Sequence, residues 1–197
     1  SDYYERYVFK GSRWRALPII SLSIGQGELG ITPLQLANYC AMLANRGHYY
    51  IPHIVREIEG CEIPEKFRAR QESGISRRHF DPVINGMEKV MQPGGTGGRS
   101  AIPEVAVCGK TGTAQNPHGA DHSVFMAFAP KDNPKIAVSV YVENGIWGAT
   151  YAAPIASLVI EKYLNDTISS QRLWLEESML KANLMNPLII PESGDEE

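Results

Sequence analysis

The stretch from Val107 to Gln115, which reads Val-Cys-Gly-Lys-Thr-Gly-Thr-Ala-Gln, places one lysine and two threonines along a single predicted strand. Side chains alternate across a strand, so Lys110 and Gly112 share one face and Thr111 and Thr113 share the other. An ammonium and two hydroxyls can donate to a carboxylate, and a glycine lets a ligand approach the backbone. The stretch therefore indicates a strand edge suited to an anion. An ordinary strand that contains glycine is the alternative.

This stretch is the first of three predicted strands, which are separated by two turns. The runs are strand-like at 104–115, 123–129 and 135–143, and turn chemistry stands between them at Asn116-Pro117-His118-Gly119 and at 130–134. Because both connections are short, we expect neighbouring strands to pair antiparallel.

Helical spacing of apolar residues predicts the other main elements. Helices are expected at 34–44, opened by Thr32-Pro33 and closed by Gly47, and at 76–91, 152–164 and 169–184. A strand is expected at 49–58, a strand or buried connector at 17–24, loops at 59–73 and 92–100, and a disordered acidic tail at 191–197. The predicted fold class is α+β, an antiparallel sheet with packed helices.

Composition excludes several classes of function. The chain has 197 residues, 43% of them hydrophobic and 21% charged, and a net charge of −3, which gives no case for binding nucleic acid. No apolar run is long enough to span a bilayer. The three cysteines form no CxxC pair, so neither a zinc site nor a disulfide framework is indicated.

Two histidines and an aspartate gather near the turn after the first of these strands. A metal site built from His118, Asp121 and His122 is conceivable, but no cysteine lies near them and only one of their spacings suits a shared set of ligands. We instead expect His122 to form a local hydrogen bond that steadies the strand at 123–129. No metal is predicted.

The order of motifs resembles a known family. Lys110-Thr111-Gly112 extends to Lys-Thr-Gly-Thr-Ala-Gln, follows a Gly-rich loop, and precedes two strands and an apolar helix. Together with four further motifs, this order is similar to the class B penicillin-binding protein transpeptidases over roughly residues 10–165, and Gln26 is more typical of the elongation-type penicillin-binding protein 2 group. The further motifs are Gly25-Gln26-Gly27 with Ile31 to Ala37, Leu43 to Gly47, Asp121 to Phe125, and Phe128-Ala129-Pro130.

This resemblance implies a partial penicillin-binding-protein/serine β-lactamase-like transpeptidase fold. Residues 1–165 would be the C-terminal portion of the transpeptidase domain, and residues 166–197 a helical extension with the acidic tail. The implied activity is that of a D-alanyl-D-alanine transpeptidase, which cross-links peptidoglycan stem peptides through a serine acyl-enzyme. β-Lactams acylate the same serine. No metal or organic cofactor is implied, and the full-length protein would be anchored at the outer face of a bacterial cytoplasmic membrane.

The resemblance also implies roles for four residues. Lys110 would help to bind and polarise the ligand at the active site. Thr111 and Thr113 would hold the carboxylate of the substrate or antibiotic, and Gly112 would leave room for the ligand. Thr113 would also offer its backbone N–H to the oxyanion hole.

Two motifs of the family are missing from the matching region. The chemistry needs a Ser-x-x-Lys nucleophile and a Ser-x-Asn element, both preceding Lys-Thr-Gly. No Ser-x-Asn exists here, and the one Ser-x-x-Lys, Ser178 to Lys181, follows Lys-Thr-Gly and is expected to be a chance match. We therefore expect an excised piece whose nucleophile lies upstream, which is inactive alone, and which self-associates through exposed apolar surface.

Two alternatives stay open at this point. One is a degenerate, non-catalytic transpeptidase-like binding module. The other is a relative in the serine β-lactamase or carboxypeptidase branch, against which the pattern from Gly25 to Ala37 and the extended Lys-Thr-Gly motif argue.

Overall fold

The computed structural model describes residues 3–11, 13–27 and 30–185, and the predicted acidic tail lies outside them. The chain divides into two compact units, Ser1–Thr32 and Pro33–Glu197. The predicted boundary at residue 165 concerns the extent of the family domain and stays a prediction.

The first unit contains a π-helix, η1 (Tyr4–Val8), and an α-helix, α1 (Ala16–Ser23). The prediction of a strand or connector at 17–24 was wrong. A short apolar run fits a strand or a helix equally well by periodicity, and Pro18 is compatible with the first turn of a helix. Neither helix contains a buried residue.

The second unit is built on a three-stranded antiparallel sheet in the order β3-β4-β5. The strands are β3 (Cys108–Ala114), β4 (His122–Ala129) and β5 (Ile136–Val142). Thr111 stands opposite Phe125, and Phe125 stands opposite Val140. The three predicted strands and their antiparallel pairing are confirmed.

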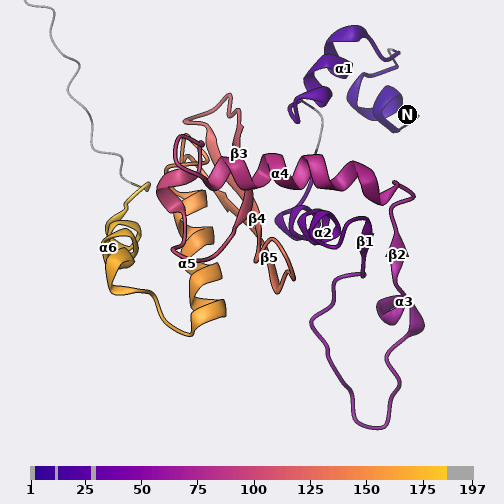
Figure 1. The fold of residues 1–197 in the computed structure, drawn as a ribbon. Helices are drawn as coiled ribbons and strands as arrows, with labels where there is room; N and C mark the ends of the chain where they lie inside the picture. The colour runs from indigo at the N-terminus through magenta and orange to yellow at the C-terminus, as the bar shows by residue number, and fades with distance from the viewer. Residues whose placement is uncertain (1–2, 12, 28–29, 186–197) are drawn as a thin grey trace, which may run out of the picture. The chain divides into compact units, whose positions relative to one another are not determined.

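Helices cover both faces of this sheet, which gives three layers (Figure 1). Helix α5 (Ala152–Asn165) packs on the face that carries Phe125. Helices α2 (Pro33–Ala44) and α4 (Phe80–Met91) pack on the opposite face, where Phe128 joins their core. The predicted α+β class is therefore confirmed.

The end of α2 differs in one detail from the prediction. Arg46 adopts a left-handed conformation, with φ of 57°, and Gly47 follows at φ of 113°. The Gly47 N–H donates to Met42 O (2.9 Å) and the Arg46 N–H to Leu43 O (3.0 Å), the pair of bonds that defines a Schellman motif. Arg46 thus takes the position expected for glycine. Gly47 is required next to it because a Cβ there would lie 3.0 Å from the Phe80 ring.

The segment between α2 and α4 carries less strand than predicted. The expected strand at 49–58 is reduced to β1 (His48–Tyr49), and the expected loop at 59–73 contains α3 (Glu65–Arg68) and β2 (Gln71–Glu72). β1 and β2 pair antiparallel. Pro52 has no N–H to give to a ladder, and the apolar side chains beyond it are exposed, so a longer strand would have nothing to bury.

The helix expected at 152–164 is confirmed as α5, whereas the helices expected at 76–91 and 169–184 are shorter than predicted. Helix α4 begins at Phe80, after a 3-10 turn, η2 (Arg77–His79), and another 3-10 turn, η3 (Gly98–Ser100), ends the loop at 92–100. The helix expected at 169–184 consists of η4 (Ser170–Arg172) and α6 (Leu173–Lys181).

The three cysteines differ sharply in accessibility, which gives a first test of the fold. Cys40 on α2 and Cys108 on β3 are buried in the core that α2 and α4 form with the sheet, whereas Cys61 is exposed. Burial, with the neighbouring thiol as a lesser cause, raises the pKa of Cys40 from 9.0 to about 12. Burial likewise raises the pKa of Cys108 to about 12.

We expect a thiol reagent at about pH 8 to label Cys61 alone in the folded chain and all three cysteines after denaturation. Rapid labelling of all three thiols without denaturant would contradict the packing of α2 and α4 on this face of the sheet.

The two buried thiols also make stability depend on pH. Because both ionise less readily in the folded state than in the unfolded state, their contribution to the free energy of unfolding is fully present below about pH 9. It is lost as the pH rises towards 12.

Candidate functional site

β3 forms one edge of the sheet and carries all four predicted site residues. Within the described residues, only β4 pairs with it. Lys110 and Gly112 stand opposite Met126 and Val124, on the face covered by α2 and α4. Thr111 and Thr113 lie on the other face, so the predicted alternation is confirmed. The roles predicted for the four residues stay predictions.

Lys110 is exposed, and its Nζ donates to the backbone carbonyl of Thr111 at 2.5 Å. The ammonium therefore lies beside the backbone of β3 and close to the Thr111 position. Thr111, Gly112 and Thr113 are each half-buried. The strand thus presents a positive charge and hydroxyl groups at a surface that a ligand can reach.

A further hydroxyl joins this strand from the Gly-rich loop. Thr96 Oγ1 lies 3.0 Å from Thr111 Oγ1, within hydrogen-bonding distance. The flanking glycines allow this approach: a Cβ on Gly95 would lie 2.3 Å from Lys89 O, and one on Gly97 would lie 2.7 Å from Met91 Sδ. Sequence reasoning missed Thr96, although the run Gly-Gly-Thr-Gly-Gly marked the loop as a place where backbones come close.

The loop that follows β5 packs over the same part of the sheet. Ser123 is fully buried, and its Oγ donates to Trp147 O (2.8 Å) and accepts from the Ala152 N–H (3.1 Å). Gly148 lies directly on the sheet, where a Cβ would come within 2.6 Å of Gly112 O. Ser123 therefore fastens the loop and the start of α5 to β4. The Trp147 side chain is 66% exposed and does not pack into the core.

The residues considered as metal ligands form hydrogen bonds in the turn between β3 and β4 and to the segment after β5. His122 Nδ1 accepts from the Asn144 N–H (3.1 Å), and Asp121 Oδ1 accepts from the Asn116 N–H (3.1 Å). His122 thus forms a hydrogen bond, as expected, but its partner is 22 residues away in the sequence and not local. Within the part of the chain that the structure describes, no group of three or more His, Cys, Asp or Glu residues is placed to hold a metal ion.

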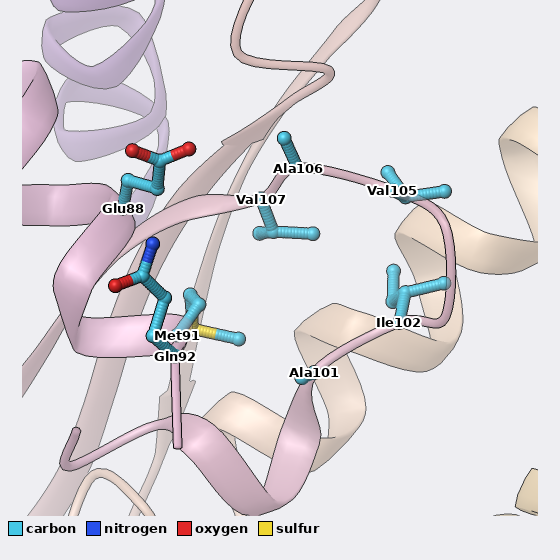
Figure 2. Close-up of a pocket in the computed structure, with 8 residues that line it drawn as sticks. All are labelled: Glu88, Met91, Gln92, Ala101, Ile102, Val105, Ala106 and Val107. Atoms are coloured by element: carbon cyan, nitrogen blue, oxygen red, sulfur yellow. The ribbon is translucent and has the colours of Figure 1, made fainter. Parts of the chain in front are cut away.

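A small pocket lies at the other end of β3 and is separate from Lys110 to Thr113. It has a volume of about 120 Å³ and lies between the end of α4 and the residues before β3 (Figure 2). Glu88 at its rim is paired with Lys131 at 2.8 Å, and most of the remaining lining is apolar. None of the four predicted site residues lines it.

Comparisons with known proteins agree with the motifs on β3. The model of the family described as penicillin binding protein transpeptidase domain matches residues 8–161, which include the whole three-stranded sheet. This chain belongs to the penicillin-binding protein transpeptidase family. The resemblance inferred from the sequence is confirmed, including its similarity to the penicillin-binding protein 2 group.

Three relatives of this member of the family show how much of their length it covers. It is 36% identical to the peptidoglycan D,D-transpeptidase MrdA of Acinetobacter baumannii, over 78% of the chain and 25% of MrdA. A crystal structure of Pseudomonas aeruginosa PBP2 in complex with WCK 5153 matches with a TM-score of 0.73 and 33% identity, over 86% of this chain and 38% of that one. The imipenem acyl-enzyme complex of penicillin-binding protein A from Mycobacterium tuberculosis matches with a TM-score of 0.61 and 36% identity, over 74% and 33%. The chain thus spans about a quarter of the length of MrdA.

The one Ser-x-x-Lys of this chain does not form a nucleophile and base pair. Ser178 is exposed on α6, and the Lys181 ammonium is paired with Glu177 at 2.5 Å. The serine lies outside the region that the family model matches. The geometry therefore gives Ser178 no catalytic setting, in line with the prediction that this match arises by chance.

Proposed function

We propose that this chain is the C-terminal part of a peptidoglycan D,D-transpeptidase and that β3 is the strand along which the stem peptide binds. The observation that carries the proposal is the arrangement of Lys110, Thr111 and Thr96 at the exposed edge of β3. It occurs in a chain whose relatives include peptidoglycan D,D-transpeptidases. The nucleophilic serine would lie on a segment that precedes this chain.

The proposed reaction is an acyl transfer in two steps. The serine hydroxyl attacks the carbonyl between two D-alanines, an ester to the enzyme forms, and the terminal D-alanine leaves with the amide nitrogen. The amine of a neighbouring stem peptide then attacks the ester, which forms the cross-link and frees the serine. In each step negative charge develops on the carbonyl oxygen, and the Thr113 backbone N–H would stabilise it.

The side chains of β3 would recognise the free carboxylate of the substrate or of a β-lactam. The Lys110 ammonium supplies a positive charge, and the hydroxyls of Thr111 and Thr113 supply donors. Hydrogen bonds to a charged acceptor are stronger than those between neutral groups, so this set favours ligands that end in a carboxylate. Gly112 leaves the backbone open beside them.

The proposed location follows from the relatives. They are enzymes of bacterial cell-wall synthesis, which is consistent with the cell envelope. We propose that the full-length protein works at the outer face of the cytoplasmic membrane, held by an N-terminal anchor. None of the helices that the structure describes is both long and apolar enough to cross a membrane.

Covalent binding of benzylpenicillin tests the proposed function. We expect intact mass spectrometry to show one adduct on the full-length protein and none on this chain. Prior incubation with a second β-lactam should block the adduct. If the full-length protein forms no adduct, the chain is part of a degenerate binding module. Rapid hydrolysis of the antibiotic would instead indicate the serine β-lactamase branch.

Gly112 gives a test of how closely the ligand lies along β3. The nearest atom to a Cβ at this position is Val124 Cβ, at an ordinary contact distance of 3.4 Å, so the fold accepts alanine here. We expect Gly112→Ala in the full-length protein to keep its melting temperature but to slow acylation by benzylpenicillin by about 10- to 100-fold, because the methyl group misplaces the ligand.

Gly148→Ala is a contrasting variant, because a Cβ at this position would clash with the backbone of β4 and, at 2.6 Å, with Gly112 O itself. Its Cβ would lie 2.5 Å from Val124 O, so we expect a loss of about 1–3 kcal/mol in the free energy of unfolding. Wild-type acylation by Gly112→Ala would show that the ligand does not lie against this part of β3.

A further inference from the structure

A buried ion pair joins the C-terminal segment to α5. Arg172, the last residue of η4, is 5% exposed and Glu161 on α5 is 1% exposed. Arg172 Nη1 donates to Glu161 Oε2, and Arg172 Nη2 donates to Ser157 Oγ at 2.6 Å. The Ser169 N–H donates to Glu161 Oε1 at 3.1 Å. Both charges are therefore paired and hydrogen-bonded.

The same guanidinium reaches the Gly-rich loop beside β3. Arg172 Nη2 also donates to the backbone carbonyl of Ser100, at 3.2 Å, across 72 residues of sequence. Ser100 is buried at the end of η3, and its N–H donates to Gly97 O at 2.9 Å. Gly97 follows Thr96, whose hydroxyl lies 3.0 Å from that of Thr111. A short series of bonds thus runs from Arg172 to the threonine pair.

The choice of arginine fits a role in fixing geometry. A buried ion pair adds little net stability compared with apolar side chains of similar size. The planar guanidinium, however, directs its donors at fixed angles, which a lysine ammonium does not do. Here those donors hold α5 on one side and the Ser100 carbonyl on the other. Arg172 therefore fixes the base of the loop that carries Thr96.

We propose that Arg172 is a positioning residue for the Thr96 and Thr111 hydroxyls, acting through Ser100 and Gly97. Arg172 lies beyond residues 8–161, the region that the family model matches. The proposal rests on the proposed function, because it assumes that Thr111 binds the carboxylate of the ligand. It makes residues 169–172 part of the framework of the active site.

The test uses the full-length protein and two ligands, benzylpenicillin and its methyl ester. The double variant Arg172→Met/Glu161→Gln removes both buried charges and the bond to Ser100. We expect it to fold and to bind benzylpenicillin about 3- to 10-fold more weakly before acylation, which corresponds to one weakened hydrogen bond. Affinity for the methyl ester, which lacks the carboxylate charge, should change less than twofold relative to wild type, since about 0.4 kcal/mol or less is at stake.

Further variants separate positioning from general loss of structure. Thr96→Val should reproduce the effect, and adding it to the double variant should cause little further loss, because both act on one contact. Lys181→Met/Glu177→Gln removes the exposed pair on α6 and should leave both ligands unaffected. Arg172→Lys keeps the positive charge but not the planar set of guanidinium donors, and it should also weaken benzylpenicillin binding. This variant replaces the double variant in the test if the double variant does not fold.

Two results would overturn the proposal. Equal losses for benzylpenicillin and its methyl ester would show that Arg172 only stabilises the fold, and unchanged binding of both would show that the loop does not depend on it. Failure of the wild-type protein to form any adduct would instead refute the proposed function.

Discussion

Replacement of Lys110 by alanine should slow acylation of the full-length protein by benzylpenicillin by about 10²- to 10³-fold, the size of effect seen when one group that stabilises developing charge is removed. Lys110 is exposed and its one described bond is to the Thr111 carbonyl, so the fold does not depend on it. The melting temperature should therefore stay close to that of the wild type. Stopped-flow acylation with a fluorescent penicillin measures the rate.

Lys135→Ala is the matched control for charge. Lys135 is exposed in the turn before β5, at the opposite end of β4 from the residues that pair with Thr111 to Thr113. Lys135→Ala changes the net charge of the protein by the same amount as Lys110→Ala does. Any general electrostatic attraction between the protein and the antibiotic is therefore affected equally by the two variants. If Lys110→Ala and Lys135→Ala both acylate at nearly the wild-type rate, β3 is not the wall of the active site.

Breaking the buried ion pair between Arg172 and Glu161 should have a large effect on the stability of the chain. Arg172→Met alone leaves the Glu161 carboxylate buried without its partner, and we expect the free energy of unfolding of this chain to fall by about 3–5 kcal/mol. Adding Glu161→Gln should recover most of that loss, because the buried charge is then gone. Urea unfolding followed by circular dichroism measures both values.

The exposed pair on α6 supplies the comparison. Lys181→Met should cost less than about 0.5 kcal/mol, since surface ion pairs contribute little. A loss of the same small size for Arg172→Met would mean that water reaches the Glu161 carboxylate and that the C-terminal segment does not pack on α5 as described.

Local patterns in the sequence were enough to predict the sheet and the faces of the site. The alternation in 107–115 and the short turns fixed which side of β3 carries Lys110 and which carries Thr111, because period-two patterning and tight connections are local properties. The helix at 34–44 was found in the same way, from apolar spacing and Thr32-Pro33. These are the parts of the fold in which neighbouring residues alone decide the outcome.

Contacts between distant residues could not be predicted. Thr96 meets Thr111 from 15 residues away and Arg172 meets Ser100 from 72 residues away, and neither pair leaves a periodic signal in the sequence. The predictions for residues 17–24 and 49–58 were wrong for another reason. Short apolar segments are compatible with either a helix or a strand until their packing is known. Self-association of the chain stays a prediction, which light scattering at high concentration can test.

The most direct test of the central claim is to locate the acylated serine. The full-length protein would be labelled with benzylpenicillin and digested, and the modified peptide sequenced by mass spectrometry. We predict that the adduct lies upstream of this chain, on a serine followed three residues later by lysine, and that Lys110→Ala reduces its formation. An adduct on Ser178 or on any other serine of this chain would contradict the account.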